Sequence, residues 1–188
     1  MRLFVAMDIP EGVRAAISAI VANLHPTCPE ARWVRIEGLH VTLKFIGETP
    51  DARAPEIRSA LASIAPRSPI AIRFRGLGFF PNAKRPRVFW AGAEAGDDLA
   101  KLAAAVESCL DPLGIAREDR AFAPHLTLAR FDPPRSQDAL QSVIEKCGSL
   151  EFGGVTANEF HLYQSVLKRG GAEYTRLATF PLRGSEKE

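Results

Sequence analysis

Two histidines, each followed two residues later by a threonine, are the side chains of this sequence best suited to do chemistry. They are His40 with Thr42 and His125 with Thr127. Both pairs lie in stretches that alternate polar and apolar residues, a pattern typical of half-buried strands. A buried apolar face fixes the register of such a strand, so each histidine shares a face with its threonine and points away from the core. The two imidazoles therefore form a candidate acid–base pair.

In-line displacement at phosphorus suits two imidazoles that face each other. One group takes a proton from the attacking water, and another, on the opposite side, gives a proton to the leaving oxygen. Histidine can do either near neutral pH, because its unperturbed pKa is roughly 6.5. Threonine hydroxyls and an arginine can hold the non-bridging oxygens, where negative charge must be stabilised. The motifs thus favour chemistry on a phosphate ester.

Other kinds of site find less support in the sequence. The two histidines could join in a metal site, but catalytic zinc normally takes a third protein ligand, and neither strand face offers a neighbouring Asp, Glu or Cys. The sequence holds no Gly-x-Ser-x-Gly elbow and no glycine-rich phosphate loop that opens a helix. Of the other histidines, His25 precedes a proline and is read as a loop residue. His161 shares a strand face with Glu159 and Tyr163, and is read as a surface or supporting residue.

The composition is that of an ordinary globular protein. The 188 residues carry 24 basic and 22 acidic side chains, a net charge of +2 that gives no broad polycation for gripping long nucleic acid. The three cysteines, Cys28, Cys109 and Cys147, have no metal-ligand spacing, and their odd number argues against a disulfide framework. We expect a cytoplasmic protein with no signal peptide and no membrane-spanning segment.

Strands and helices that would position the motifs follow from periodicity and from turn residues. The first motif strand should put Lys44 on the face of His40, and Phe45 on the apolar face, in the core. Asp8 is read as an acidic cap of the first helix, and Gly114 as the stop of the third. Strands are predicted over residues 3–7, 33–36, 39–46, 70–80, 87–93, 122–130, 155–167 and 174–182. Helices are predicted over residues 10–24, 51–65, 97–113 and 136–146.

A sparse internal repeat runs through this order. The offset of 85 residues between His40 and His125 also carries Phe4 to Phe89 and Leu77 to Leu162. It predicts an α+β fold of two similar lobes related by an approximate two-fold axis, each with helices on the outer face of an antiparallel sheet. The inner faces would meet in a central cleft that carries both motifs. Residues 1–183 should form this single bilobal domain, followed by a disordered polar tail over residues 184–188.

These motifs resemble those of the two-histidine (2H) phosphoesterases, and within them the RNA 2′,3′-cyclic phosphodiesterases, historically called 2′-5′ RNA ligases. The resemblance rests on residues 40–47 (His-Val-Thr-Leu-Lys-Phe-Ile-Gly) and 124–130 (Pro-His-Leu-Thr-Leu-Ala-Arg). Weaker support comes from residues 2–6, 33–34, 86–90 and 162–165, and the likeness covers about residues 1–183. It implies the bilobal fold with a central cleft, and no metal or nucleotide cofactor.

The resemblance also implies a reaction and a role for each site residue. The family opens a terminal 2′,3′-cyclic phosphate of RNA to a 2′-phosphomonoester. His40 maps to the proton donor for the departing 3′ oxygen, and His125 to the proton acceptor from water. Thr42, Thr127 and Arg130 map to contacts with the phosphate. Alternation puts Arg130 on the apolar side of an ideal strand, so the strand must end or bend there; the Asp-Pro-Pro at 132–134 provides such a break.

Several alternatives stay open. The same cleft could hold a nucleotide or an RNA end without turnover, as a binding module. It could also join RNA ends through a 2′-5′ bond, or cleave 2′-5′ oligonucleotides. The expected partners are RNA ends or nucleotides with a 2′,3′-cyclic phosphate, met by a monomer that binds no membrane. Five basic residues on the predicted hairpin 70–93 either follow an RNA backbone or form a solvated face: Arg73, Arg75, Lys84, Arg85 and Arg87.

Overall fold

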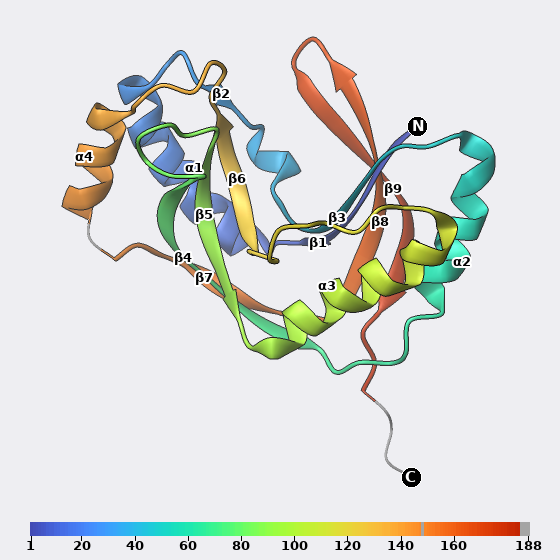
Figure 1. The fold of residues 1–188 in the computed structure, drawn as a ribbon. Coiled ribbons are helices and arrows are strands. Elements are labelled where there is room, and N and C mark those ends of the chain that lie inside the picture. Colours follow the sequence, from blue (N-terminus) through green and yellow to red (C-terminus); the bar gives the residue numbers. More distant parts are fainter. Residues whose placement is uncertain (148, 185–188) are drawn as a thin grey trace.

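Two antiparallel sheets form the framework of the molecule (Figure 1), in a computed structural model that describes residues 1–147 and 149–184. Sheet A has the strand order β3-β1-β8-β9, and sheet B the order β2-β6-β5-β4-β7. Sheet A consists of β1 (Arg2–Asp8), β3 (His40–Glu48), β8 (Glu159–Lys168) and β9 (Gly171–Pro181). Sheet B consists of β2 (Arg32–Trp33), β4 (Ile70–Phe80), β5 (Val88–Ala95), β6 (His125–Arg130) and β7 (Glu151–Ala157).

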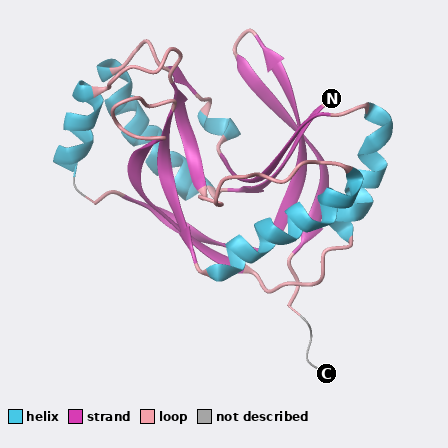
Figure 2. Ribbon diagram, viewed as in Figure 1, coloured by secondary structure: helices cyan, strands magenta, loops and turns pink. Residues whose placement is uncertain are grey.

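Helices cover the outer side of each sheet (Figure 2). They are α1 (Glu11–Leu24), α2 (Ala54–Ala62), α3 (Asp97–Leu110) and α4 (Asp138–Cys147). Helix α1 follows a strand of sheet A but packs against β7 of sheet B, and α3 follows a strand of sheet B but packs against β3 of sheet A. This exchange of helices interlocks the two halves of the chain, so neither lobe is a continuous segment.

The predicted repeat is confirmed in the order of the strands. Sheet A reads β3-β1-β8-β9, and four neighbouring strands of sheet B read β6-β5-β4-β7, with the first-named strand of each series carrying a histidine motif. The constant offset is wrong. Phe45 and Arg130 are equivalent positions, because each comes five residues after its motif histidine. Phe4 lies opposite Phe45 and Val88 lies opposite Arg130, so Val88 rather than Phe89 is the counterpart of Phe4.

A β-bulge lies at the same place in both motif strands. In β3 the pairing skips Leu43, because Val5 lies opposite Lys44 and Ala6 opposite Thr42. In β6 it skips Leu128, because Phe89 lies opposite Ala129 and Trp90 opposite Thr127. The extra residue reverses the alternation beyond it. The first six residues of both strands consequently show the same pattern of burial. The fourth and fifth residues are both buried, and the sixth, Phe45 in β3 and Arg130 in β6, is exposed.

The bulge overturns two predictions about the first motif strand. Phe45 is 60% exposed rather than in the core, and Lys44 is buried rather than on the face of His40. The Lys44 ammonium lies 2.8 Å from a carboxylate oxygen of Glu107 on α3 and donates to the Ala116 carbonyl at 2.5 Å. These contacts satisfy the buried charge and fix α3 on the outer side of β3. The same reversal brings Arg130 back to the side of His125, which an unbroken strand could not do.

Several predicted boundaries need correction. The strand predicted over residues 155–167 is two strands, β7 in sheet B and β8 in sheet A, and Asn158 lies between them. The strand predicted over residues 33–36 is only Arg32–Trp33, and the second motif strand begins at His125 rather than at residue 122. Other predictions are confirmed: the strand over residues 70–80 has those bounds, and Gly114 adopts a left-handed φ of 75° after a short 3₁₀ turn.

The predicted single domain over residues 1–183 stays a prediction. The predicted tail falls mostly on residues 185–188, which lie outside the described part of the chain. Of the helices within the described ranges, none has the length and apolar character needed to cross a bilayer.

Candidate active site

Both motif histidines are anchored in the same way. The Nδ1 atom of His40 lies 2.7 Å from the carbonyl oxygen of Gly38, and Nδ1 of His125 lies 2.7 Å from the carbonyl oxygen of Ala123. A carbonyl oxygen can only accept, so Nδ1 carries the proton in each ring. Each Nε2 is thereby left without the proton in the neutral imidazole, and is the atom able to take or to give one.

Aromatic rings hold the two imidazoles in place. The ring of His40 lies 4.7 Å from that of Phe4 and meets Tyr174 edge-on at 5.1 Å. Gly38 allows this approach, because a Cβ on Gly38 would lie 2.9 Å from the Tyr174 ring. The ring of His125 meets Phe80 edge-on at 5.0 Å. The orientation of each imidazole is therefore set before any ligand binds.

The two motifs share one site. Strands β3 and β6 lie against each other although they belong to different sheets. Each histidine is the first residue of its strand, and the charge of His125 is among the minor causes that lower the pKa of His40. Thr42 and Thr127 are partly exposed and, two residues along each strand, share the face of the histidine that precedes them. The structure thus brings both predicted His–Thr pairs together.

Arg130 stands near both imidazoles. It is exposed at the end of β6, and its positive charge lowers the pKa of His40 and of His125. Burial raises the pKa of the Tyr174 hydroxyl, and the charge of Arg130 opposes that shift; the Tyr174 ring lies against His40. The charge of Arg130 therefore acts on both motifs and not on His125 alone. Together with the two threonines it can supply hydrogen bonds to an anion placed between the rings.

Burial is the main cause that lowers the pKa of both histidines, because the cationic form loses hydration. The carbonyl oxygens of Gly38 and Ala123 oppose the shift by stabilising the protonated rings. One further cause distinguishes them: the carboxylate of Asp8 raises the pKa of His40, whereas among the described residues no carboxylate acts in this way on His125. The two imidazoles are thus alike in anchoring but differ in their electrostatic surroundings.

Asp8 is the residue of the site that sequence reasoning assigned wrongly. The first helix begins after Pro10 without a side-chain cap, and Asp8 ends β1 directly opposite His40. Its carboxylate accepts hydrogen bonds from the Tyr163 hydroxyl at 2.5 Å and from the Arg176 guanidinium. Tyr163 and Arg176 come from β8 and β9, which the sequence alone could not place beside β1. The pKa of Tyr163 is raised to about 12 by burial and by its bond to Asp8.

His161 is a buried residue that lies beside Asp8. It is 1% exposed rather than on the surface; its Nδ1 lies 3.0 Å from the Thr179 hydroxyl and its Nε2 lies 3.6 Å from an oxygen of Asp8. Burial lowers the pKa of His161. Its position identifies it as part of the support for Asp8 rather than as a third imidazole of the site.

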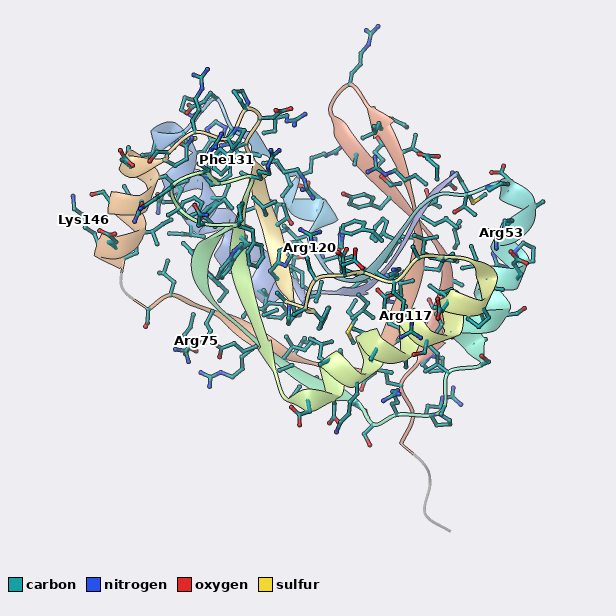
Figure 3. All side chains as sticks on the ribbon, in the orientation of Figure 1. Arg53, Arg75, Arg117, Arg120, Phe131 and Lys146 are labelled. Atoms are coloured by element: carbon teal, nitrogen blue, oxygen red, sulfur yellow. The ribbon has the colours of Figure 1, made fainter. Side chains whose placement is uncertain are left out.

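A cavity of about 390 Å³ opens beside His40. Most of the residues that line it belong to strands of sheet A. Figure 3 draws the side chains between the ribbons. Its walls combine aromatic rings with charged groups. They include Phe4, Asp8, Glu37, Tyr163, Tyr174 and Arg176. Such a mixture suits a ligand with both a flat ring and hydrogen-bonding groups.

Other chemistries have little support in the described residues. Within residues 1–147 and 149–184, no cluster of three or more His, Cys, Asp or Glu side chains is arranged to hold a metal ion. Burial raises the pKa of the Cys28 thiol to about 11, so this cysteine is a poor nucleophile. The histidine pair remains the chemically most capable group.

Comparison with known proteins gives a consistent set of relatives. A family model described as the 2′-5′ RNA ligase superfamily matches residues 4–169. A protein of Archaeoglobus fulgidus named RNA 2′,3′-cyclic phosphodiesterase is 34% identical over 180 residues, covering 96% of this chain and 99% of the relative. A protein of the same name from Aeropyrum pernix is 40% identical over 147 residues, covering 78% of this chain and 83% of the relative.

Solved structures agree with these relatives. The crystal structure of a Thermus thermophilus protein matches with a TM-score of 0.81 at 34% identity, over 99% of this chain and 100% of the other. Escherichia coli LigT complexed with 3′-AMP matches with a TM-score of 0.76 at 28% identity, over 97% of this chain and 98% of the other. The likeness extends over both sheets and is not confined to one motif.

Proposed function

Because the chain belongs to the 2′-5′ RNA ligase superfamily of 2H phosphoesterases, we propose that it hydrolyses the terminal 2′,3′-cyclic phosphate of RNA to a 2′-phosphomonoester. The observation that carries the proposal is the matched pair of imidazoles, each with Nδ1 held 2.7 Å from a backbone carbonyl oxygen. The relatives named RNA 2′,3′-cyclic phosphodiesterase, 32–40% identical to this chain, support the substrate.

The reaction needs one proton to be removed and one to be delivered. Nε2 of His125 accepts a proton from a water molecule, whose oxygen forms the new bond to phosphorus. On the opposite side the bond from phosphorus to O3′ breaks, and the protonated Nε2 of His40 gives its proton to O3′. The product carries a 2′-phosphate and a free 3′-hydroxyl. His125 then loses its proton to solvent and His40 regains one, so the enzyme is restored.

Asp8 supports the assignment of His40 as the donor. Its carboxylate lies opposite His40 and favours the imidazolium form. The counterpart of Asp8 in sheet B is Gly92, opposite His125. A side chain cannot easily replace this glycine, because its Cβ would lie 2.5 Å from the carbonyl oxygen of Arg75. The two halves of the pseudo-symmetric site therefore differ: a carboxylate favours the protonated form of His40, and a glycine stands in the equivalent position opposite His125.

The remaining site residues act on the phosphate itself. Hydroxyls of Thr42 and Thr127 and the guanidinium of Arg130 donate to the non-bridging oxygens, where negative charge builds up as water adds. Arg130 also lowers the pKa of both histidines, which keeps His125 neutral and makes the proton of His40 more acidic.

A product assay tests the proposed function. An RNA oligonucleotide ending in a 2′,3′-cyclic phosphate is incubated with the protein, in the presence of EDTA, and the product is identified by phosphorus NMR. We expect a 2′-phosphomonoester and no 3′-phosphomonoester. A 3′-phosphate product would contradict the position of His40 beside O3′, and an activity that depends on added metal ion would contradict the two-histidine mechanism.

Replacing Asp8 by asparagine should change the pH dependence of the reaction. The carboxylate raises the pKa of His40, so its loss lowers that pKa and moves the alkaline limb of kcat/KM to lower pH. Near pH 7.5 the rate should fall about threefold to tenfold, because above its pKa the imidazolium fraction drops about tenfold for each unit by which the pKa falls.

The matched control is Tyr163→Phe, which removes a hydrogen bond to Asp8 and leaves its charge in place. Tyr163→Phe should keep the position of the alkaline limb. If the asparagine variant of Asp8 loses activity equally at every pH, Asp8 only maintains the shape of the site and its proposed effect on His40 is wrong.

A further inference from the structure

Four exposed cations gather at the end of sheet B where β6 stops, next to Arg130. We call them the basic edge: Arg32, Lys84, Arg85 and Arg87. Arg32 lies on β2 directly opposite Arg130, and the other three come from the connection between β4 and β5. The amide of Phe131 donates to the carbonyl oxygen of Arg87 at 3.0 Å, which holds this connection beside the end of β6. Figure 3 labels Phe131 at this end of the sheet.

The basic edge has little charge compensation. Two arginines directly opposite each other on neighbouring strands, as Arg32 and Arg130 are, repel one another. Asp132 lies 3.4 Å from Arg32, but both side chains are about 70% exposed, so the pair contributes little. Among the described residues, no carboxylate lies within ion-pair distance of Lys84, Arg85 or Arg87.

The connection is nevertheless ordered. The side-chain oxygen of Asn82 accepts hydrogen bonds from the backbone amides of Lys84 and Arg85, at 3.0 and 3.1 Å. The other two basic residues of this hairpin have their charges compensated: Arg73 pairs with Glu151 at 2.7 Å, and Arg75 pairs with Glu94 at 3.5 Å. The hairpin therefore divides into a neutralised part along β4 and an uncompensated part next to Arg130.

We propose that the basic edge binds the backbone of the single-stranded RNA that precedes the 3′ end. The inference rests on the proposed function, which places the terminal phosphate between the histidines and O3′ at His40. Arg130 contacts the terminal phosphate in that reaction, so the terminal ribose lies close to Arg32, which is directly opposite Arg130 on β2. The chain leaves that ribose through its 5′ oxygen, and the next phosphates meet Arg32 and then the connection between β4 and β5. Exposed arginines with little charge compensation suit such a polyanion.

The double variant Arg85→Gln/Arg87→Gln tests the proposal. For an oligonucleotide of eight residues that ends in a 2′,3′-cyclic phosphate, KM at low salt should rise about tenfold while kcat stays unchanged. The slope of log KM against log salt should become shallower by about 1.4, since each contact with a single-strand phosphate contributes about 0.7. For a nucleoside 2′,3′-cyclic phosphate, which has no preceding chain, kcat/KM should not change.

The matched control is Arg73→Gln/Arg75→Gln, which removes two arginines from the same hairpin that are already paired with carboxylates. This control should leave the KM of the oligonucleotide and its salt slope near the wild-type values. An equal rise in KM for the oligonucleotide and for the mononucleotide would overturn the proposal. So would an unchanged salt slope in the Arg85 and Arg87 variant.

Failure of the proposed function is distinguishable from failure of the basic edge. Fluorescence anisotropy with a labelled RNA octamer measures binding without turnover. If the wild-type protein hydrolyses neither substrate but binds the octamer in a salt-dependent way that the Arg85 and Arg87 variant loses, the function is wrong and the edge is supported. If the protein hydrolyses the mononucleotide and binds the octamer no better than the variant does, the function stands and the edge is wrong.

Discussion

His40→Ala is expected to lower kcat on RNA 2′,3′-cyclic phosphate by about 10²–10⁴-fold, the usual contribution of a general acid. Without the imidazolium, O3′ must leave as an unstabilised alkoxide. KM should change much less, because the phosphate still meets Thr42, Thr127 and Arg130. The measurement is steady-state hydrolysis of a cyclic-phosphate-ended oligonucleotide, with far-UV circular dichroism and thermal unfolding to show that the fold is kept.

A matched control exists within the same chain. His25→Ala removes an exposed imidazole that lies 5.5 Å from Trp33 and takes no part in the site. It should retain wild-type kcat. If the His40 variant hydrolyses the substrate as fast as the His25 variant, His40 is not the proton donor.

His125→Ala should lower kcat by a similar factor of about 10²–10⁴, here because water is left without a general base. The fold should again persist, since His125 stands at the start of β6 and its ring is partly exposed. The effects of the two single substitutions should not multiply in the double variant, because the two imidazoles act on one phosphorus atom in one step. Independent, multiplying effects would contradict a shared transition state.

These two variants also distinguish an enzyme from a binding module. A cleft that only holds an RNA end would show saturable binding of a nucleoside 2′,3′-cyclic phosphate by the wild-type protein, with no product. Phosphorus NMR separates the outcomes, because ring opening moves the resonance of the cyclic phosphate. In joining RNA ends through a 2′-5′ bond, a 5′-hydroxyl would take the place of water: His125 would accept its proton and His40 would protonate the departing O3′. This activity would therefore disappear in the same variants.

The sequence was sufficient to predict the motifs and the two-lobed architecture. Alternation around His40 and His125 put each imidazole with its threonine, and the repeat predicted two similar lobes, whose sheets have matching strand orders. These are local or periodic signals, which a single sequence carries. Alternation failed beyond Leu43, because a bulge depends on how β3 pairs with β1 and leaves no mark on composition. The exposure of Phe45 and the burial of Lys44 both follow from that one residue.

The residues that support His40 could not be predicted from the sequence, for a different reason. Asp8, Tyr163 and Arg176 stand far apart in the chain and meet only because β1 is a central strand between β3 and β8. An acidic helix cap and an acidic residue at the end of a strand look alike in sequence, so the sequence alone assigns Asp8 to the helix that follows it. The helix exchange between lobes is likewise invisible, since α1 would be equally amphipathic on either sheet.

The pH dependence of kcat/KM tests the central claim most directly, because it reports the essential acid and base of the free enzyme. Burial lowers the pKa of both His40 and His125, so the wild-type profile should be bell-shaped with its maximum below pH 6.5. The residual activity of His40→Ala should lack the alkaline limb, and that of His125→Ala should lack the acid limb. If both variants keep the full bell, these two imidazoles are not the groups that give and take the proton.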